Sequence, residues 1–376
     1  MYIMKWMIRI CRSLVLIFFL MVSSVLLAQQ SENNAETDTL FTKMFQRDCC
    51  GITGVDGIYS ILLPNGNSLW IFGDTFLGTV NEDGSRDKID PIFIRNSVAV
   101  QSAYNLRTYY GKTNNRETSF LIPPDAPVGA VFSEDSLWFW PGYAFVYGKE
   151  VKIFLSSFYQ KSEGGWGFQW TGTWIASVDY ETMELISLDK IEIPTNTEIH
   201  WGHAVCDEAD DFLYVYGLGS GKPYVARISK EFNGQAVVKN ANNWMYYDGK
   251  SWMKDINDIV PMDDFGGSEQ FSIFKIGNKF VYLSQGGGFS NGIFTLNSST
   301  PYGPWSKPKK IYEVPAFDNK NVFAYNALAH PQFTKEGKLL VSFCVNSFEM
   351  EDVFVNADNY RPRFVRIPIA DILSND

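Results

Sequence analysis

The sequence predicts an all-β protein, specifically a five-bladed β-propeller, and two observations lead to this prediction. A short strand, a turn and a strongly apolar strand recur five times along the chain of 376 residues. The starts of these hairpins lie 57 to 85 residues apart, which leaves room after each for two further strands. Four-stranded units at irregular spacings of this size are typical of propeller blades.

The five hairpins share a turn rich in Gly, Asn, Asp or Lys and a second strand that ends in polar residues or glycine. They are "DGIYSILLPNGNSLWIFGDT" from Asp56, "PGYAFVYGKEVKIFLSSF" from Pro141, "WGHAVCDEADDFLYVYGLG" from Trp201, "SEQFSIFKIGNKFVYLSQGGG" from Ser268 and "YNALAHPQFTKEGKLLVSFCVNS" from Tyr325. "GTWIASVDY" from Gly172 and "KPYVARI" from Lys222 are examples of the further strands. A pair of packed sandwiches, the alternative, would show short strands without this paired repeat.

The first residues have the pattern of a secretory signal peptide. Lys5, Arg9 and Arg12 precede an apolar run from Leu14 to Val22, and small and apolar residues follow up to Ala28. We therefore expect residues 1–28 to be a signal peptide, residues 29–38 a flexible polar leader and residues 39–376 a single domain. This predicts a secreted or periplasmic protein without membrane insertion.

Charge and aromatic content narrow the class of partner. Removal of residues 1–28 would take away three positive charges and change the net charge from −10 to −13. Such a chain is a poor partner for nucleic acid or an anionic membrane surface. The aromatic fraction of 16% suits a neutral substrate with apolar faces, such as a glycan. The sequence leaves the oligomeric state open.

Four cysteines follow the predicted signal peptide: Cys49, Cys50, Cys206 and Cys344. Their even number permits disulfides, but Cys49 and Cys50 could pair with each other only in a strained ring. The favoured expectation is that most of the four are buried thiols.

The motif "LWIFGDTFLG" from Leu69 to Gly78 places a carboxylate at the end of an apparently buried strand. Asp74 has two interpretations at this stage. It could form a turn by accepting hydrogen bonds from nearby amides, or it could belong to a site formed by strand ends of different blades. The first strand of each blade lines the central channel of a propeller, so its leading residues meet at one mouth.

The strand ends supply an unusual set of side chains for that mouth. The set comprises Asp56, Asp74, Trp140, His200, Trp201, His203, Glu269, Asn326 and His330. Paired carboxylates beside aromatic rings suit glycoside hydrolysis, in which one acid protonates the leaving oxygen and another carboxylate activates water or attacks the sugar. We expect Asp56, Asp74 and Glu269 to be catalytic, and Trp140 and Trp201 to stack on sugar faces.

The histidines give a weaker indication of a metal site. His200 and His203 form an HxxH pair, but residues three apart on a regular strand point to opposite faces and cannot readily hold one ion. We expect one of them to bind sugar hydroxyls or to tune a carboxylate, with Asn326 and Arg95 also binding substrate. No cofactor is required; His330 is a candidate ligand for a structural cation on the propeller axis.

Both ends of the chain resemble a known group of secreted bacterial propellers. "DGIYSILLPNGNSLWIFGDTFLG", "YNALAHPQF", "GKLLVSFCVNS" and "NADNYRPRFVRIPI" resemble the domain-of-unknown-function families 4185 and 5005, over roughly Thr39 to Ile369. Part of that group is similar to the endo-D-arabinofuranosidases of glycoside hydrolase family 183, and the fold is similar to five-bladed arabinanases and levanases. The resemblance implies that Asp56 in "VDGIYS" and Asp74 in "FGDTF" are catalytic, with Glu269 matched only by its place in the repeat.

Two other functions fit parts of the same pattern. A non-catalytic carbohydrate-binding propeller would use the same aromatic residues, with the acids accepting hydrogen bonds from hydroxyls. A polysaccharide lyase would need a base beside a neutralised uronate, for which Arg95, Arg361 and Arg363 are candidates. Finally, ring closure predicts that "RPRFVRIPI" shares a blade with a segment around Thr39 to Met44, since an unclosed ring would expose a strand edge.

Overall fold

The computed structural model describes residues 35–89, 91–126, 137–163, 167–193, 197–230 and 238–374. The expected signal peptide and most of the expected leader lie outside these residues. Within them the fold is all-β, as predicted, and the helices are short. None of the described helices has the length and apolar character needed to cross a membrane.

Five antiparallel sheets of four or five strands form the body of the fold. In four of them the strands are paired in the order in which they occur in the chain. The first sheet contains β3 (Tyr59–Leu62), β4 (Ser68–Phe72), β7 (Ser97–Ser102) and β8 (Asn105–Tyr109), and the second β11 (Leu137–Tyr147), β12 (Glu150–Gln160), β13 (Phe168–Asp179) and β14 (Leu185–Lys190). The third contains β15 (His200–Cys206), β16 (Phe212–Gly219), β17 (Lys222–Ser229), β18 (Met245–Tyr247) and β19 (Trp252–Met253).

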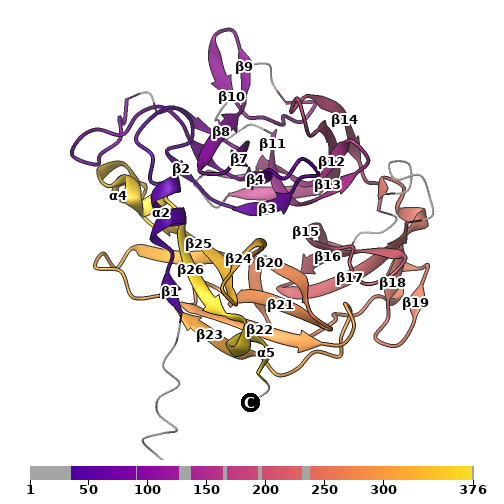
Figure 1. Ribbon diagram of the computed structural model, residues 1–376. Coiled ribbons are helices and arrows are strands. Elements are labelled where there is room, and N and C mark those ends of the chain that lie inside the picture. Colours follow the sequence, from indigo (N-terminus) through magenta and orange to yellow (C-terminus); the bar gives the residue numbers. More distant parts are fainter. Residues whose placement is uncertain are drawn as a thin grey trace, which may run out of the picture. The chain divides into compact units, whose positions relative to one another are not determined.

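The last two sheets complete the series. The fourth contains β20 (Gly267–Ile276), β21 (Lys279–Gly286), β22 (Gly292–Ser298) and β23 (Lys309–Glu313), and the fifth β24 (Val322–Lys335), β25 (Lys338–Ser347), β26 (Arg363–Pro368) and β1 (Glu36–Thr37). All five predicted hairpins are therefore present as the first two strands of a sheet. The first strands β3, β11, β15, β20 and β24 contact one another in this order, and β24 also contacts β3 (Figure 1).

The hydrophobic core lies between neighbouring sheets. Tyr59 and Ile71 of the first sheet pack in one cluster with Phe139 and Ile153 of the second. Similar clusters join the second sheet to the third, the third to the fourth, and the first to the fifth. β15, for example, contributes Trp201 to one cluster and Ala204 to the next, so it is packed on both faces.

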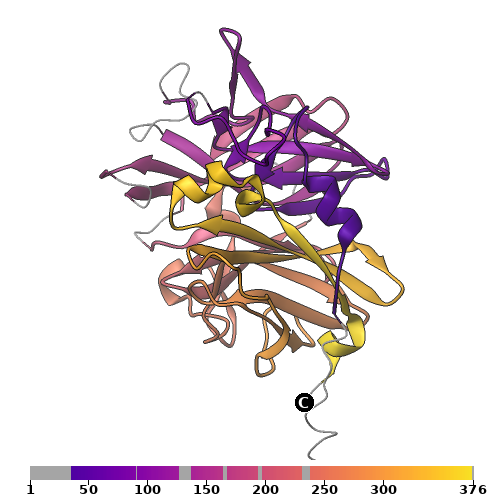
Figure 2. The same ribbon diagram turned by 90° about the vertical axis from the view of Figure 1, so that its left-hand side faces the viewer.

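The two ends of the chain meet in the fifth sheet. β1 pairs with β26 through Glu36 opposite Arg366 and Thr37 opposite Val365, and the two segments lie side by side in Figure 2. The predicted partner segment, Thr39–Met44, is instead in helix α2 (Thr39–Phe45), which is N-capped by Asp38. Phe41 and Phe45 lie four residues apart on one face of this helix and pack against Phe364. Residues 36–38, which we expected in the leader, therefore belong to the fold.

Smaller elements surround the main sheets. β2 (Gly54–Val55), β5 (Thr75–Phe76) and β6 (Phe93–Ile94) form a three-stranded sheet, and β9 (Gly111–Thr113) pairs with β10 (Arg116–Thr118). The remaining elements are helices α4 (Met350–Val355) and α5 (Ile369–Leu373) and the 3₁₀ turns η1 (Ala241–Asn243), η2 (Ile256–Asp258) and η3 (Ala357–Tyr360).

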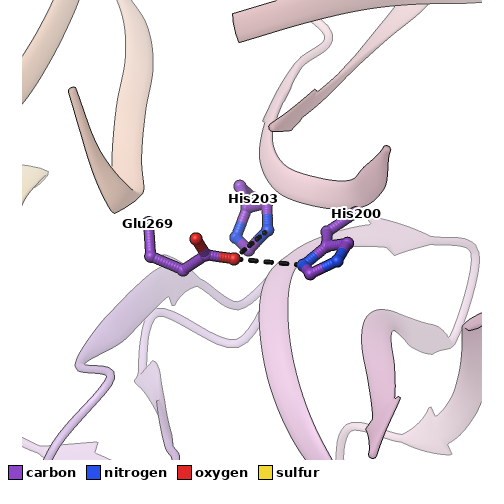
Figure 3. Close-up of side chains that lie close together, drawn as sticks. All are labelled: His200, His203 and Glu269. Carbon is purple, nitrogen blue, oxygen red and sulfur yellow. Dashed lines mark hydrogen bonds and ion pairs between the residues drawn. The ribbon is translucent and has the colours of Figure 1, made fainter. Parts of the chain in front are cut away.

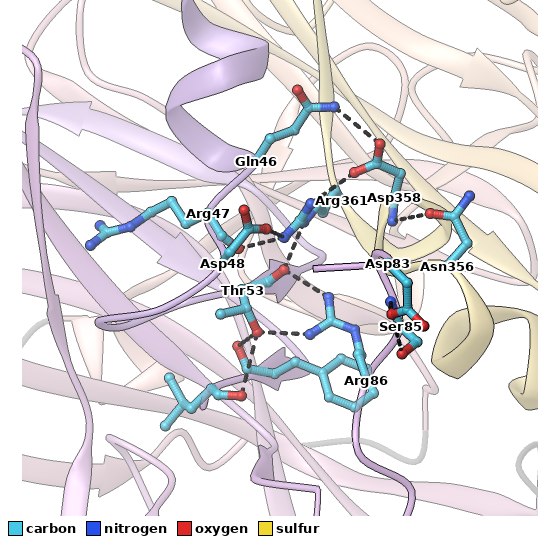
Figure 4. Close-up of polar contacts among 12 residues, drawn as sticks. Gln46, Arg47, Asp48, Thr53, Asp83, Ser85, Arg86, Asn356, Asp358 and Arg361 are labelled. Atoms are coloured by element: carbon cyan, nitrogen blue, oxygen red, sulfur yellow. Dashed lines mark hydrogen bonds and ion pairs between the residues drawn. The ribbon is translucent and has the colours of Figure 1, made fainter. Parts of the chain in front are cut away.

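Two buried arginines, Arg361 of the C-terminal segment and Arg86 of the loop after β5, hold the loop before β2 (Figure 4). Arg361 donates to the carbonyl oxygen of Thr53 at 2.9 Å and forms ion pairs with Asp48 and Asp358, both at 2.9 Å. Arg86 donates to the hydroxyl and the carbonyl oxygen of Thr53, each at 2.7 Å. These contacts fix Thr53, three residues before Asp56. Arg361 is thus committed to the fold rather than available as the substrate-binding arginine of a lyase.

The cysteines differ in part from the expectation. Cys49 and Cys50 form a disulfide with each other, on the exposed loop after α2. Cys206 and Cys344 are buried free thiols, as expected.

Candidate active site

Asp56 and Asp74 come together because β2 and β5 pair. Val55 lies opposite Thr75 in this antiparallel ladder, so the next pair along is Asp56 and Asp74. Beyond this pair the backbone forms a bulge: the Asp56 N–H donates to the Asp74 carbonyl oxygen at 3.2 Å, whereas the Asp56 carbonyl oxygen accepts from the Gly73 N–H at 2.9 Å, so that Gly73 and Asp74 both lie opposite Asp56. The two side chains are close enough for the charge of Asp74 to raise the pKa of Asp56. The two carboxylates therefore share one site.

The partners of the two carboxylates are different. The hydroxyls of Tyr325 and Tyr360 donate to Oδ2 of Asp56 at 2.7 and 2.9 Å. The indole N–H of Trp140 donates to Oδ1 of Asp74 at 2.8 Å, and the Arg95 guanidinium contacts its Oδ2 at 3.3 Å. Asp56 is thus held by neutral donors and Asp74 by a cation and an indole.

Burial and mutual repulsion change the acidity of the pair. Burial, together with the charge of Asp74, raises the pKa of Asp56 to about 7, although the two tyrosine hydrogen bonds oppose this. Burial also raises the pKa of Asp74, and here Arg95 and Trp140 oppose the rise. Asp56 is consequently the carboxyl that holds a proton near neutral pH.

Gly73 makes room for the Asp56 carboxylate. A Cβ atom on Gly73 would lie 2.5 Å from Oδ1 of Asp56, closer than any side chain allows. The "GDT" of the motif therefore has a steric reason: the residue before Asp74 must be glycine if Asp56 is to lie beside it.

An aromatic wall adjoins Asp74, formed by Trp138, Trp140, Phe158, Phe168 and Trp170 of the second sheet. Within it, the Trp140 ring lies 4.7 Å from the Phe158 ring and 4.8 Å from the Phe168 ring, between centroids. Arg95, the partner of Asp74, lies over the Trp138 ring at 4.1 Å. Trp140 and Trp170 are only half-buried, so the wall presents indole surface that a sugar ring could cover.

Glu269, His200 and His203 form a second cluster, in which both imidazole rings face one carboxylate (Figure 3). Oε1 of Glu269 lies 3.1 Å from Nδ1 of His200 and 3.5 Å from Nε2 of His203. The expectation that the two histidines point to opposite faces is wrong. A β-bulge interrupts β15 between Trp201 and Ala204, so Gly202 and His203 have no partners in the ladder and the alternation of side chains is broken.

Gly202 permits that bulge. Its φ angle is 93°, which favours glycine, and a Cβ there would lie 2.2 Å from Cβ of Phe154. Burial lowers the pKa of His203 to about 4, so this imidazole is neutral at pH 7. Partial loss of water around the carboxylate alone would raise the pKa of Glu269, but the side chain is largely exposed, and the hydrogen bond with His200 and the two imidazoles lower the pKa below its ordinary value.

The two clusters adjoin each other. A Cβ on Gly57, the residue after Asp56, would lie 3.0 Å from Nε2 of Gln270, the residue after Glu269. On the other side, the Trp170 ring of the aromatic wall stacks on His200 at 4.7 Å. The described residues thus place three carboxylates, two histidines and the aromatic wall in one region.

Three other predicted site residues lie elsewhere or play other parts. Trp201 is 1% exposed and packs edge-on against Trp244 in the core, so it offers no platform to a sugar. His330 is fully buried, and its two ring nitrogens are hydrogen-bonded to the hydroxyls of Ser60 and Ser342 at 2.6 and 2.8 Å. It therefore has no nitrogen left for an ion. Asn326 lies at a bulge in β24 and accepts a hydrogen bond from Ser268.

Sequence reasoning missed Tyr325, Tyr360, Trp170 and Gln270. Tyr325 directly precedes the predicted Asn326, and Gln270 directly follows the predicted Glu269, so a window of one residue would have included both. Tyr360 comes from η3, which no hairpin pattern locates. Trp170 lies opposite Phe158, just where β12 and β13 shift register, so regular alternation along β13 does not predict its direction.

This arrangement is chemically suited to proton transfer. It contains one carboxyl with a pKa near 7, a neighbouring carboxylate held by a cation, and an aromatic surface beside them. Two titratable groups whose surroundings separate their proton affinities can act as acid and base in one reaction.

Comparison with solved structures identifies proteins of similar architecture. A crystal structure of a suspected hydrolase from Bacteroides ovatus ATCC 8483 matches with a TM-score of 0.75 and 22% identity, over 91% of this chain and 93% of that chain. This likeness shows a shared fold. No curated protein matches the sequence.

Two structures of glycoside hydrolase family 43 match more weakly. BlXynB from Bacillus licheniformis has a TM-score of 0.49 and 10% identity, over 84% of this chain and 51% of that chain. An enzyme from Xanthomonas citri complexed with xylose has a TM-score of 0.47 and 11% identity, over 84% of this chain and 87% of that chain. Both scores are below 0.5 and are too low to indicate a common site.

A family model matches nearly the whole of the described chain. It is the model of the domain of unknown function DUF5005, and it covers residues 38–369, which include Asp56, Asp74 and Glu269. The expected resemblance to family 5005 is thereby confirmed, while the likeness to family 4185 and to glycoside hydrolase family 183 stays a prediction. The protein belongs to the DUF5005 family.

Proposed function

We propose that the protein is a glycoside hydrolase with a five-bladed propeller fold, in which the five sheets are the blades. Its substrate would be a polysaccharide or oligosaccharide, and the resemblance noted above makes an arabinofuranose-containing glycan one candidate. Export directed by residues 1–28 belongs to the proposal, because it would bring the enzyme to glycans outside the cytoplasm.

The observation that carries this proposal is the cross-strand pair of Asp56 and Asp74. Asp56, whose pKa burial and Asp74 raise to about 7, is the general acid that protonates the leaving oxygen. Asp74 stays ionised beside Arg95 and the Trp140 N–H, and it acts on the anomeric carbon either directly or through water. Tyr325 and Tyr360 orient the acid.

The distance between the two carboxyl groups decides between direct attack and the use of an intervening water. Retaining glycosidases have carboxyl groups about 5–5.5 Å apart, whereas inverting enzymes separate them by about 6.5–9.5 Å. The anomeric configuration of the released sugar, followed by NMR, would therefore tell whether Asp74 acts as the nucleophile or as the base that activates water.

The surroundings of the pair support a sugar substrate. Trp140 presents its indole N–H to Asp74 and leaves part of its ring uncovered, so one residue could orient the carboxylate and contact a sugar face. The Bacteroides ovatus protein that shares the fold is a suspected hydrolase, which is consistent with the proposal. A lyase has less support, since Arg361 is bound to Thr53 and Arg363 lies over Phe317.

The proposal is tested by incubating the purified chain with a panel of plant and bacterial glycans, arabinans included. Hydrolysis would release reducing ends without the absorbance of an unsaturated product. Asp56→Asn and Asp74→Asn should abolish the release, while Asp83→Asn, in an exposed turn, should not. Glycan binding without any release would favour the carbohydrate-binding alternative, and an absorbing product would favour the lyase.

A further inference from the structure

We propose that His200, His203 and Glu269 bind a divalent transition-metal ion of the zinc type. This cluster has its own ligand set, separate from the acid pair, and the inference does not require the chain to be a glycoside hydrolase. A nitrogen of each imidazole and a carboxylate oxygen lie within 4.8 Å of one another, close enough to bind one ion together.

The spacing of these atoms suits a tetrahedral ion. With metal–ligand distances of about 2.0–2.2 Å, the ligand atoms of a tetrahedral site lie roughly 3.4 Å apart. Oε1 of Glu269 lies 3.1 Å from Nδ1 of His200 and 3.5 Å from Nε2 of His203. Two edges of the tetrahedron are therefore present, and a small rotation of either ring would shorten the third.

The buried imidazole of His203 lacks hydrogen-bond partners, which also points to a bound ion. This residue is 7% exposed, and neither of its ring nitrogens has a hydrogen-bond partner among the described residues. A buried polar group without a partner is unfavourable by about 1–3 kcal/mol. Its Nε2 nevertheless points at Glu269, 3.5 Å away. An ion between the three side chains would satisfy that nitrogen, which the hydrogen bond between His200 and Glu269 does not.

The backbone and the aromatic wall hold the ligands in place. The bulge at Gly202 brings His203 to the same side as His200, and Trp170 stacks on the His200 ring with an angle of 19° between the planes. Glu269 lies on β20, the first strand of the neighbouring sheet, and 54% of its side chain is exposed. The cluster is thus rigid on the imidazole side and open to solvent on the carboxylate side, so the fourth position of a bound ion would be accessible to water or a ligand.

The donor atoms decide the class of ion. Imidazole nitrogens suit Zn²⁺, Co²⁺, Ni²⁺ and Fe²⁺, whereas Ca²⁺ and Mg²⁺ prefer sets of oxygen ligands. Two histidines and one glutamate with an open position also form the ligand set of known zinc enzymes. We accordingly expect zinc and cobalt to bind and magnesium and calcium to compete poorly.

The test is a metal titration of the full purified chain after removal of bound ions with a chelator. Co²⁺ is added first because its visible absorption reports tetrahedral coordination, and Zn²⁺ is then used to displace it. We expect one ion per chain. Glu269→Gln and His203→Asn should each weaken binding by more than the roughly 10- to 100-fold that loss of an outer hydrogen-bond partner causes.

A control variant distinguishes binding at this site from metal binding by other exposed carboxylates of the chain. Glu313→Gln changes an exposed carboxylate on β23 that pairs with Lys310, and it should leave the affinity unchanged. If His203→Asn fails to fold, the exposed Glu269 still provides a testable variant. The proposal is overturned if the chain takes up less than one ion, or if the folded Glu269→Gln variant binds Co²⁺ as tightly as the unaltered chain does.

Discussion

The acid pair and the histidine cluster adjoin each other, yet they are stabilised in different ways. In the acid pair each carboxylate accepts hydrogen bonds from side chains, and Arg95 supplies a positive charge to Asp74. In the histidine cluster Glu269 has two imidazole neighbours, but the buried His203 has no hydrogen-bond partner among the described residues. The carboxylates of the acid pair therefore have hydrogen-bond partners within the protein. The buried imidazole of the histidine cluster has no such partner, and the proposed ion would supply one.

The largest difference should be seen when the acids of the pair are neutralised. Asp56→Asn or Asp74→Asn keeps the shape of the side chain but removes the proton donor or the ionised carboxylate. We expect kcat to fall by about 10²- to 10⁴-fold, the usual worth of positioned acid–base catalysis. The measurement is the rate of reducing-end release from a glycan that the panel identifies. Asp83→Asn is the matched control, and normal hydrolysis by both site variants would contradict the assignment.

The acid pair should also affect stability in a pH-dependent way. The pKa of Asp56 in the folded state, about 7, exceeds its ordinary value of 3.8, so the folded state binds this proton more tightly than the unfolded state. The stability that this group contributes is then fully present below about pH 4 and is lost as the pH rises through about 7. Asn cannot ionise, so Asp56→Asn should gain stability relative to the unaltered chain over this range, by at most about 4 kcal/mol.

This second prediction is checked by urea unfolding at several pH values between 4 and 8. The two curves of unfolding free energy against pH should separate as the pH rises. Parallel curves would mean that Asp56 is not buried as a proton-binding group, and Asp83→Asn provides the reference for a substitution at an exposed site.

Neutralising Glu269 tests whether the two clusters have separate roles, one in catalysis and the other in metal binding. If the acid pair performs the proton transfers, Glu269→Gln should lower kcat by about tenfold or less, and its main effect should be on metal affinity. Kinetics and Co²⁺ titration of the same preparation measure both effects. A loss of kcat as large as that of Asp74→Asn would instead make Glu269 a third catalytic carboxylate.

The smallest expected effect concerns the tyrosines that hold Asp56. The Tyr360 hydroxyl stabilises the ionised form of Asp56, so Tyr360→Phe should raise the pKa of this acid further. The basic limb of the pH profile of kcat/KM, where the acid must be protonated, should then move to higher pH, by about one unit or less. Tyr312→Phe, on β23 and away from the site, should leave the limb where it is. A shift to lower pH would reverse the assigned role of Asp56.

Much of the fold could be predicted because strand pairing leaves local traces in the sequence. The alternation of apolar residues and the turn residues located all five hairpins, including β15 and β16 around Asp210. The segment that pairs with β26 was predicted a few residues too late in the chain, around Thr39–Met44 instead of Glu36–Thr37. Phe41 and Phe45, spaced four apart after the N-cap Asp38, mark a short helix rather than a strand, and Glu36–Thr37 are too few to show alternation.

The candidate site was harder to predict where the backbone departs from regular geometry. Trp201 was assigned to the site and His203 to the opposite face from His200, since a regular strand alternates with period two. The bulge at Gly202 reverses the expectation for His203, and only the glycine hints at it. Trp201 lies before the bulge, and regular alternation with its neighbour His200 turns it toward the core. Asp56 and Asp74, by contrast, follow and precede short strands that pair regularly, and the sequence brought both to attention.

The pairing of β1 with β26 has a consequence for how the chain is made. The chain is synthesised from its N-terminus, so Glu36–Thr37 are made more than 300 residues before their partner strand Arg363–Pro368. Four sheets are each built from one continuous stretch of the chain, whereas the fifth requires both ends. Helix α2 likewise lacks its packing partner Phe364 until the C-terminal segment has been made. Premature termination a few residues before Arg363 would therefore leave the start of the molecule unanchored as well as its end, and would deprive Asp56 of the support that Arg361 gives to Thr53.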